Sequence, residues 1–139
     1  MIQIISGEKG KGKTKVLLNK VNTAIKTSNG NIVYLDKNPK HMFDVSTKVR
    51  LVNVKDYLIT NCDEFLGFLS GIISQDNDLE ELYLDSFLTI SNVQNSELCN
   101  TFQKLGEMSE KHNVNMVLSV SMNEVDLPEC AKELIIVSL

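Results

Sequence analysis

The chain has 139 residues, of which 42% are hydrophobic and 23% charged, which is ordinary for one globular domain and predicts a single domain spanning residues 1–139. The net charge of −4 argues against a broad basic surface for nucleic acid. No run of about 18 apolar residues is present, so we expect neither a membrane span nor a secretory leader.

The cysteines and histidines indicate no metal site. Cys62, Cys99 and Cys130 are odd in number, widely spaced and form no C-x-x-C pair, and His41 and His112 lie far from any of them in sequence. We therefore expect buried, reduced thiols and a cytoplasmic protein.

The first half of the chain alternates between apolar runs and a helical repeat. Residues 1–5 predict a buried strand, and 13–28 place apolar residues at helical spacing, with Gly30 as a left-handed cap. Residues 32–35 form a second apolar run. The alternation across 48–54 predicts either a short strand or a strand-like connector.

The second half continues this alternation. A capping box opens a helix over 61–73, and the apolar run 82–85 follows it. A helix over 96–112 then leads to apolar strands at 116–120 and 134–137. Continuous apolar strands separated by helices predict a three-layer α/β fold, with a mostly parallel five-stranded sheet and helices on both faces.

The segment between the first strand and the first helix matches the pattern G-x-x-x-x-G-K-[ST]. Its glycines let the backbone wrap around a phosphate, and the helix that follows directs the positive end of its dipole at the anion. Lys13 would reach the β- and γ-phosphates, and the hydroxyl of Thr14 would bind Mg²⁺. The expected phosphate-binding residues are Gly7, Glu8, Lys9, Gly10, Lys11, Gly12, Lys13, Thr14 and Lys15.

The alternative is a solvated, lysine-rich turn. Ordinary residue frequencies give this pattern by chance in roughly one chain in two hundred of this length, and here it also has the required strand and helix beside it. Lys9, Lys11 and Lys15 either add positive potential over the phosphates or are solvated, and solvation is favoured for Lys15. Glu8 is expected to turn its side chain outward.

With this motif, the chain resembles the P-loop NTPase family over nearly all of its length. In that family, an apolar strand that ends in aspartate holds Mg²⁺ through a water molecule. Residues 82–85 match that pattern, so the resemblance implies Asp85 as the magnesium-side carboxylate, together with Thr14. The alternative is an ordinary aspartate at a strand end.

The subclass follows from what accompanies the motif. Asp85 is followed by Ser-Phe-Leu and not by the D-x-x-G of GTPases, and Arg50 is the only arginine, whereas a small-molecule kinase uses several. The order of elements resembles the RecA-like branch. It is also loosely similar to the cores of twitching-motility and secretion ATPases, which carry further domains and motifs.

In the RecA-like branch, a glutamate polarises the attacking water from a place after the second strand or beside the metal-side aspartate. At those two places this chain has Asp36 and the pair Asp85-Ser86, so neither offers a glutamate. Asp36 is the nearest substitute for that glutamate, and the alternative is that Asp36 only caps the turn that follows. The family also places a polar sensor at the end of the fourth strand. Ser119, Ser121 and Asn123 are candidates, and Ser121 is selected.

These observations predict an ATP-binding protein that binds ATP or ADP with Mg²⁺ and hydrolyses ATP weakly or only with a partner. Its catalytic residues would be Lys13, Asp85, Asp36 and Ser121, and the bound state would be recognised by a protein partner or a second copy of the chain. One alternative is a non-catalytic interaction module that keeps the phosphate loop. Another is a small RecA-type DNA-handling ATPase, against which the acidic composition weighs.

Overall fold

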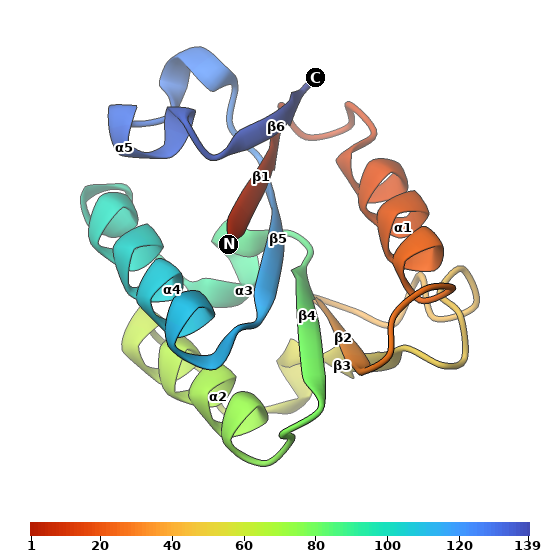
Figure 1. Ribbon diagram of the computed structural model, residues 1–139. Helices are drawn as coiled ribbons and strands as arrows, with labels where there is room; N and C mark the ends of the chain where they lie inside the picture. Colours follow the sequence, from red (N-terminus) through yellow and green to blue (C-terminus); the bar gives the residue numbers. More distant parts are fainter.

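The apolar runs form one sheet in which every neighbouring pair of strands is parallel (Figure 1). The computed structural model describes residues 1–139. The strands are β1 (Ile2–Ser6), β2 (Asn31–Asp36), β3 (Arg50–Asn53), β4 (Leu79–Leu84), β5 (Asn115–Val120) and β6 (Ile135–Ser138). Their order is β3-β2-β4-β5-β1-β6. The α/β class is confirmed. The count of five strands was wrong, because residues 50–53 pair with β2 as a sixth strand.

Helices cover both faces of this sheet. The α-helices are α1 (Lys13–Ala24), α2 (Cys62–Ser74), α3 (Phe87–Ser91), α4 (Leu98–His112) and α5 (Glu129–Lys132). Short 3₁₀ turns are η1 (Val54–Asp56), η2 (Asn95–Glu97) and η3 (Glu124–Asp126). Figure 1 shows α1 on one side of the sheet, with α2 and α4 together on the other. None of these helices has the length and apolar character needed to cross a membrane.

The first helix is shorter than its sequence pattern indicates. Regular α-helix ends at Ala24, and the backbone N–H groups of Thr27 and Ser28 both bond back to its carbonyl oxygen. Gly30 does not adopt a left-handed conformation, so its prediction as a left-handed cap was wrong. Glycine is required there because a Cβ would lie 2.2 Å from the carbonyl oxygen of Asp78, where the chain passes close to the start of β4.

The two faces of the sheet carry separate hydrophobic cores. A cluster of 26 buried residues joins the sheet to α2, α3 and α4, and a cluster of nine joins it to α1. Successive strand residues point to opposite faces, so every second residue of a strand enters the same core. Tyr34 of β2, Tyr83 of β4 and Val117 of β5 all point toward α1. This parity decides which strand-end side chains lie near the loop that precedes α1.

The cysteines correct one prediction. Cys62 is buried and reduced, as expected, but Cys99 and Cys130 form a disulfide with their Cα atoms 5.9 Å apart. Both bonded residues are exposed. The pairing could not be predicted from the sequence, because the two cysteines are 31 residues apart and meet only where α5 packs against the first turn of α4. The expectation of a cytoplasmic protein therefore loses the support it took from reduced thiols.

Candidate functional site

The loop between β1 and α1 presents an unpaired backbone surface. Gly10 and Gly12 adopt φ values of 87° and 96°, a left-handed region that favours glycine. Nothing lies within 4 Å of the place where a Cβ would stand on either residue. The backbone N–H groups that donate no hydrogen bond within the chain include those of Gly10, Gly12, Lys13, Thr14 and Lys15. These groups form a concentration of free donors at one end of the sheet.

The start of α1 adds to this positive potential. Gly12 occupies the N-cap position, no side chain caps the first turn, and no acidic residue lies in it. The unpaired N–H groups and the helix dipole therefore face outward without an internal anion. Helix N-termini with free N–H groups are suited to bind anions such as phosphate, which makes the start of α1 a candidate site.

The lysines of the loop fall into two groups. Lys13 is only 6% exposed, and its ammonium donates to the carbonyl oxygen of Glu8 at 3.0 Å. Burial lowers the pKa of Lys13, Asp85 opposes this effect, and the nearby charge of Lys37 adds to it. Lys9, Lys11 and Lys15 are exposed. Of these four lysines, only Lys13 is buried beside the loop, and the other three extend into solvent.

The other side of the loop is attached to the chain that follows β5. The N–H of Gly7 donates to the carbonyl oxygen of Met122 at 2.9 Å, and the amide of Asn123 donates to the carboxylate of Glu8 at 2.7 Å. A Cβ on Gly7 would lie 3.0 Å from the Cβ of Leu139. Glu8 therefore directs its carboxylate to Asn123, which satisfies the carboxylate within the chain.

Strand register brings three polar side chains into one row beside this loop. Leu35, Leu84 and Leu118 are paired across β2, β4 and β5. The next residues are Asp36, Asp85 and Ser119, which are 3%, 2% and 1% exposed. Because β5 lies between β4 and β1, Ser119 occupies the gap between Asp85 and the strand that leads into the loop.

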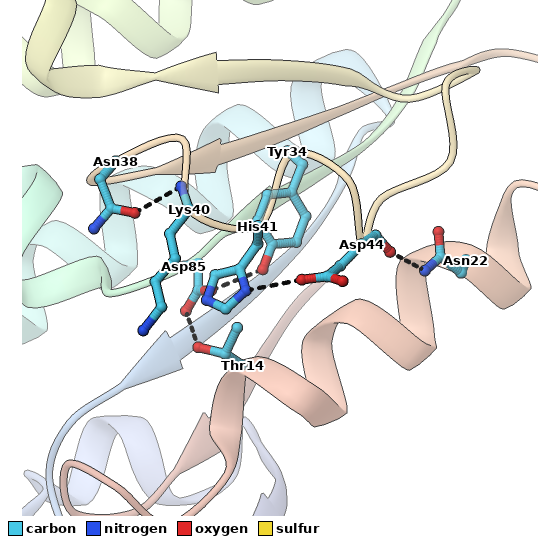
Figure 2. Close-up of polar contacts among 8 residues, drawn as sticks. All are labelled: Thr14, Asn22, Tyr34, Asn38, Lys40, His41, Asp44 and Asp85. Carbon is cyan, nitrogen blue, oxygen red and sulfur yellow. Dashed lines mark hydrogen bonds and ion pairs between the residues drawn. The ribbon is translucent and has the colours of Figure 1, made fainter.

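Asp85 accepts four hydrogen bonds, and Figure 2 shows those from Thr14 and Tyr34. Its Oδ1 accepts from the hydroxyl of Ser119 at 2.6 Å, from the N–H of Ser86 at 2.9 Å and from the hydroxyl of Thr14 at 3.3 Å. Its Oδ2 accepts from the hydroxyl of Tyr34 at 2.7 Å. Burial and the charge of Asp85 raise the pKa of Tyr34 far above its ordinary value. The tyrosine therefore remains a donor, and Asp85 is held in a fixed orientation.

Asp36 differs from Asp85 although both are buried. Its Oδ1 accepts from the N–H of Lys37 at 2.7 Å, but its Oδ2 has no partner in the chain. Burial raises the pKa of Asp36, the neighbouring charge of Asp85 raises it further, and His41 and Lys37 act in the opposite direction. A buried carboxylate oxygen without a partner in the chain costs stability, so Asp36 is a candidate for contact with a ligand.

The segment 37–49 extends over the α1 face and is fixed to that helix. Asn22 donates to the carbonyl oxygen of Asp44 at 2.8 Å and accepts from the N–H of Ser46 at 2.9 Å. His41 lies on this segment, with its Nδ1 3.2 Å from the carboxylate of Asp44 (Figure 2). The segment therefore holds Lys37 and His41 near Asp36 on a supported backbone.

The structure brings most of the expected residues together, with one change. Four of them meet where the start of α1 faces the carboxyl ends of β2 and β4: Lys13, Thr14, Asp36 and Asp85. Ser121, selected as the sensor, is exposed and beyond the end of β5, whereas the buried Ser119 bonds Asp85.

Sequence reasoning missed Tyr34. The available signal was its position two residues before Asp36 on the same strand, which places both side chains on one face.

The oxygen atoms of Thr14 and Asp85 suit a hard divalent cation. The hydroxyl of Thr14 and a carboxylate oxygen of Asp85 lie 3.3 Å apart beside the uncapped start of α1. Magnesium prefers such oxygen donors and completes its coordination with water and phosphate oxygens. These two residues could hold Mg²⁺, and Asp36, with its free oxygen, lies in the same row.

A comparison of the sequence with protein-family models found no matching family, and a comparison with curated proteins found no relative. The functional interpretation therefore rests on the geometry of this chain.

Proposed function

We propose that the chain is a P-loop nucleotide-binding protein of the RecA-like branch, which binds ATP with Mg²⁺ and hydrolyses it slowly or only with a partner. The observation that carries this proposal is the uncapped start of α1, where free N–H groups, a buried lysine and the Thr14–Asp85 contact lie at one point. A solvated turn needs none of these features. A triphosphate with its metal would use all of them.

The residues divide the work of binding. Backbone N–H groups of the loop would bind the phosphate oxygens, and Lys13 would exchange its bond to the carbonyl oxygen of Glu8 for one to the β- and γ-phosphates. Thr14 and Asp85 would hold Mg²⁺, which when bound neutralises charge on the phosphates. Ser119 and Tyr34 would keep the Asp85 carboxylate oriented toward that position.

Hydrolysis needs a group that positions or deprotonates water. Asp36 is the candidate, because its Oδ2 is buried and free and its pKa is raised toward the range where a carboxylate is a more effective base. Aspartate is shorter than the glutamate typical of this branch, and the chain has a single arginine. We therefore propose slow turnover by the isolated chain, since an arginine finger contributes roughly 10³–10⁵ in rate.

A thermal-shift panel of ATP, ADP, GTP and buffer, each with Mg²⁺, tests the proposal. At a ligand concentration one hundred times the Kd, binding adds about 2.7 kcal/mol, or about 9 °C for a domain of this length. Lys13→Ala should abolish the shift. Lys15→Ala is the matched control, because it removes the same charge from an exposed position in the first turn of α1 and should preserve the shift.

The panel also separates the alternatives. No shift with any nucleotide at millimolar concentration would reject the proposal in favour of an interaction module that keeps the loop for structure. A shift without phosphate release would indicate binding without hydrolysis. In a magnesium titration, Asp85→Asn should weaken the metal dependence of the shift, and salt-sensitive retention on single-stranded DNA would instead favour a DNA-handling ATPase.

A further inference from the structure

The disulfide between Cys99 and Cys130 lies on the surface, within reach of small molecules. Cys99 is in the first turn of α4, Cys130 is in α5, and both residues are exposed. The two cysteines border a surface cavity of about 630 Å³ whose other walls include Phe102, Gly106 and Leu134. A thiol can therefore approach the sulfur atoms without unfolding the chain.

The disulfide joins α4 to residues 121–139, a segment with few buried side chains. Helix α5 has four residues, too few to be stable alone, and its buried support comes from Ala131 and the preceding Leu127. β6 is an edge strand of four residues, none of which is fully buried. The disulfide is thus the covalent attachment of residues 121–139 to α4.

One end of this segment bonds to the phosphate loop, and the other bonds to Ser6, the last residue of β1. Before Cys130, the carbonyl oxygen of Met122 accepts from the N–H of Gly7 at 2.9 Å, and Asn123 donates to Glu8 at 2.7 Å. After Cys130, the N–H of Leu139 donates to the carbonyl oxygen of Ser6 at 2.9 Å. A shift of α5 away from α4 would act on the loop from both directions.

We propose that Cys99–Cys130 is a thiol–disulfide exchange site whose substrate is a dithiol, and that its reduction loosens the segment 121–139 and with it the phosphate loop. The exchange requires only the exposed bond. The consequence for nucleotide affinity rests on the proposed function, whereas the consequence for the loop itself does not.

The chemistry needs no further reactant. A thiolate of the dithiol attacks one cysteine sulfur, the S–S bond breaks, and the other cysteine leaves as a thiolate. The second thiol of the dithiol then attacks the mixed disulfide and releases the first cysteine. The dithiol is oxidised to its own disulfide, and the protein gains two electrons and two protons as two thiols. Buried Cys62 takes no part, and its hydroxyl neighbour Thr101 lies 3.4 Å from its sulfur.

The test uses the full oxidised chain and dithiothreitol as the dithiol. Reduction under native conditions should raise the mass by two hydrogens and make two cysteines accessible to alkylation, with Cys62 protected until the chain is denatured. Resistance of the bond to dithiothreitol in the folded protein would overturn the exchange site. The double variant Cys99→Ser/Cys130→Ser should reproduce the reduced state and should not respond to the dithiol.

Amide hydrogen exchange reads the coupling without any nucleotide. On reduction, exchange of the Gly7 amide and of residues 121–139 should accelerate by roughly fivefold or more, the lower end of ordinary coupling between sites. Strand β2, which is separated from β6 by β4, β5 and β1, serves as the internal reference. Unchanged exchange at Gly7 after complete reduction would overturn the coupling.

Nucleotide affinity supplies the second readout. The Kd for Mg·ATP should rise by roughly fivefold or more in the reduced chain and in the double variant. Equal Kd values in both states would remove the link to binding. If neither state binds a nucleotide while hydrogen exchange at Gly7 still responds to the dithiol, the proposed function fails and the exchange site stands.

Discussion

Removing the hydroxyl of Tyr34 should release one oxygen of Asp85. In Tyr34→Phe, the Oδ2 of Asp85 loses its only donor, while its Oδ1 keeps its own donors. The ring itself is retained, and it lies in the α1 core stacked with Tyr83 at 6.3 Å between ring centres. The change therefore removes a hydrogen bond without opening a large cavity.

The size of the effect follows from burial and charge. Tyr34 is fully buried and Asp85 is 2% exposed, so solvent cannot readily replace the lost bond. A hydrogen bond to a charged group contributes about 1.5–3 kcal/mol. Taking about 2 kcal/mol and an unfolding entropy of about 2.1 cal/mol/K per residue, the melting temperature should fall by about 7 °C.

Urea unfolding at neutral pH in the absence of nucleotide measures this difference. Tyr83→Phe is the matched control, because Tyr83 is 1% exposed but donates at 2.6 Å to Glu81, away from the loop. Glu81 is only partly buried, so that variant should lose less than about 1 kcal/mol. The slope of the urea dependence should stay unchanged in both variants. Equal losses in the two variants would refute the claim that Tyr34 holds Asp85.

Three further predictions concern the loop before α1 and the carboxyl ends of the strands beside it. Gly12→Ala places a side chain at φ 96°, so it should lower the free energy of unfolding in urea by about 1–2 kcal/mol and abolish the thermal shift with Mg·ATP. The control Gly67→Ala, inside α2, should raise the free energy of unfolding by about 0.5–1 kcal/mol and leave the thermal shift unchanged. The pKa of Asp36 is raised in the folded protein, so the free energy of unfolding should fall as the pH rises from 3.8, the ordinary pKa of aspartate, through the pKa of the folded state. Asp36→Asn should flatten this fall and unfold at a higher urea concentration at pH 7. A lower urea midpoint for the variant would contradict this. Ser119→Ala removes a buried donor to Asp85 and should cost about 1–2 kcal/mol in the same assay, and a change below 0.5 kcal/mol would show that the bond is dispensable.

The glycine-rich loop between strand and helix and the α/β class could be predicted from local pattern alone. Gly10 and Gly12 occupy two positions of the loop where the backbone turns left-handed, and glycine adopts that conformation without a steric penalty. Apolar runs separated by helices likewise require a parallel sheet covered on both faces. These features depend on residues that are close in sequence, where periodicity and spacing are informative.

The pairing of residues distant in sequence could not be predicted in this way. Arg50–Asn53 alternates too briefly to distinguish a strand from a connector, and only its pairing with β2 decides the matter. Cys99 and Cys130 carry no spacing signal, because their approach depends on how α5 returns to α4. The choice of Ser121 over Ser119 had the same cause, since the end of β5 is set by its neighbours.

The sequence by itself therefore determined that a glycine-rich loop joins a strand to a helix in an α/β domain. Only the tertiary structure decided which side chains stand beside that loop. Asp36, Asp85 and Ser119 come from three strands, and they meet because the parallel register of β2, β4 and β5 aligns their carboxyl ends. Register is a property of paired strands, so no single segment of sequence contains it.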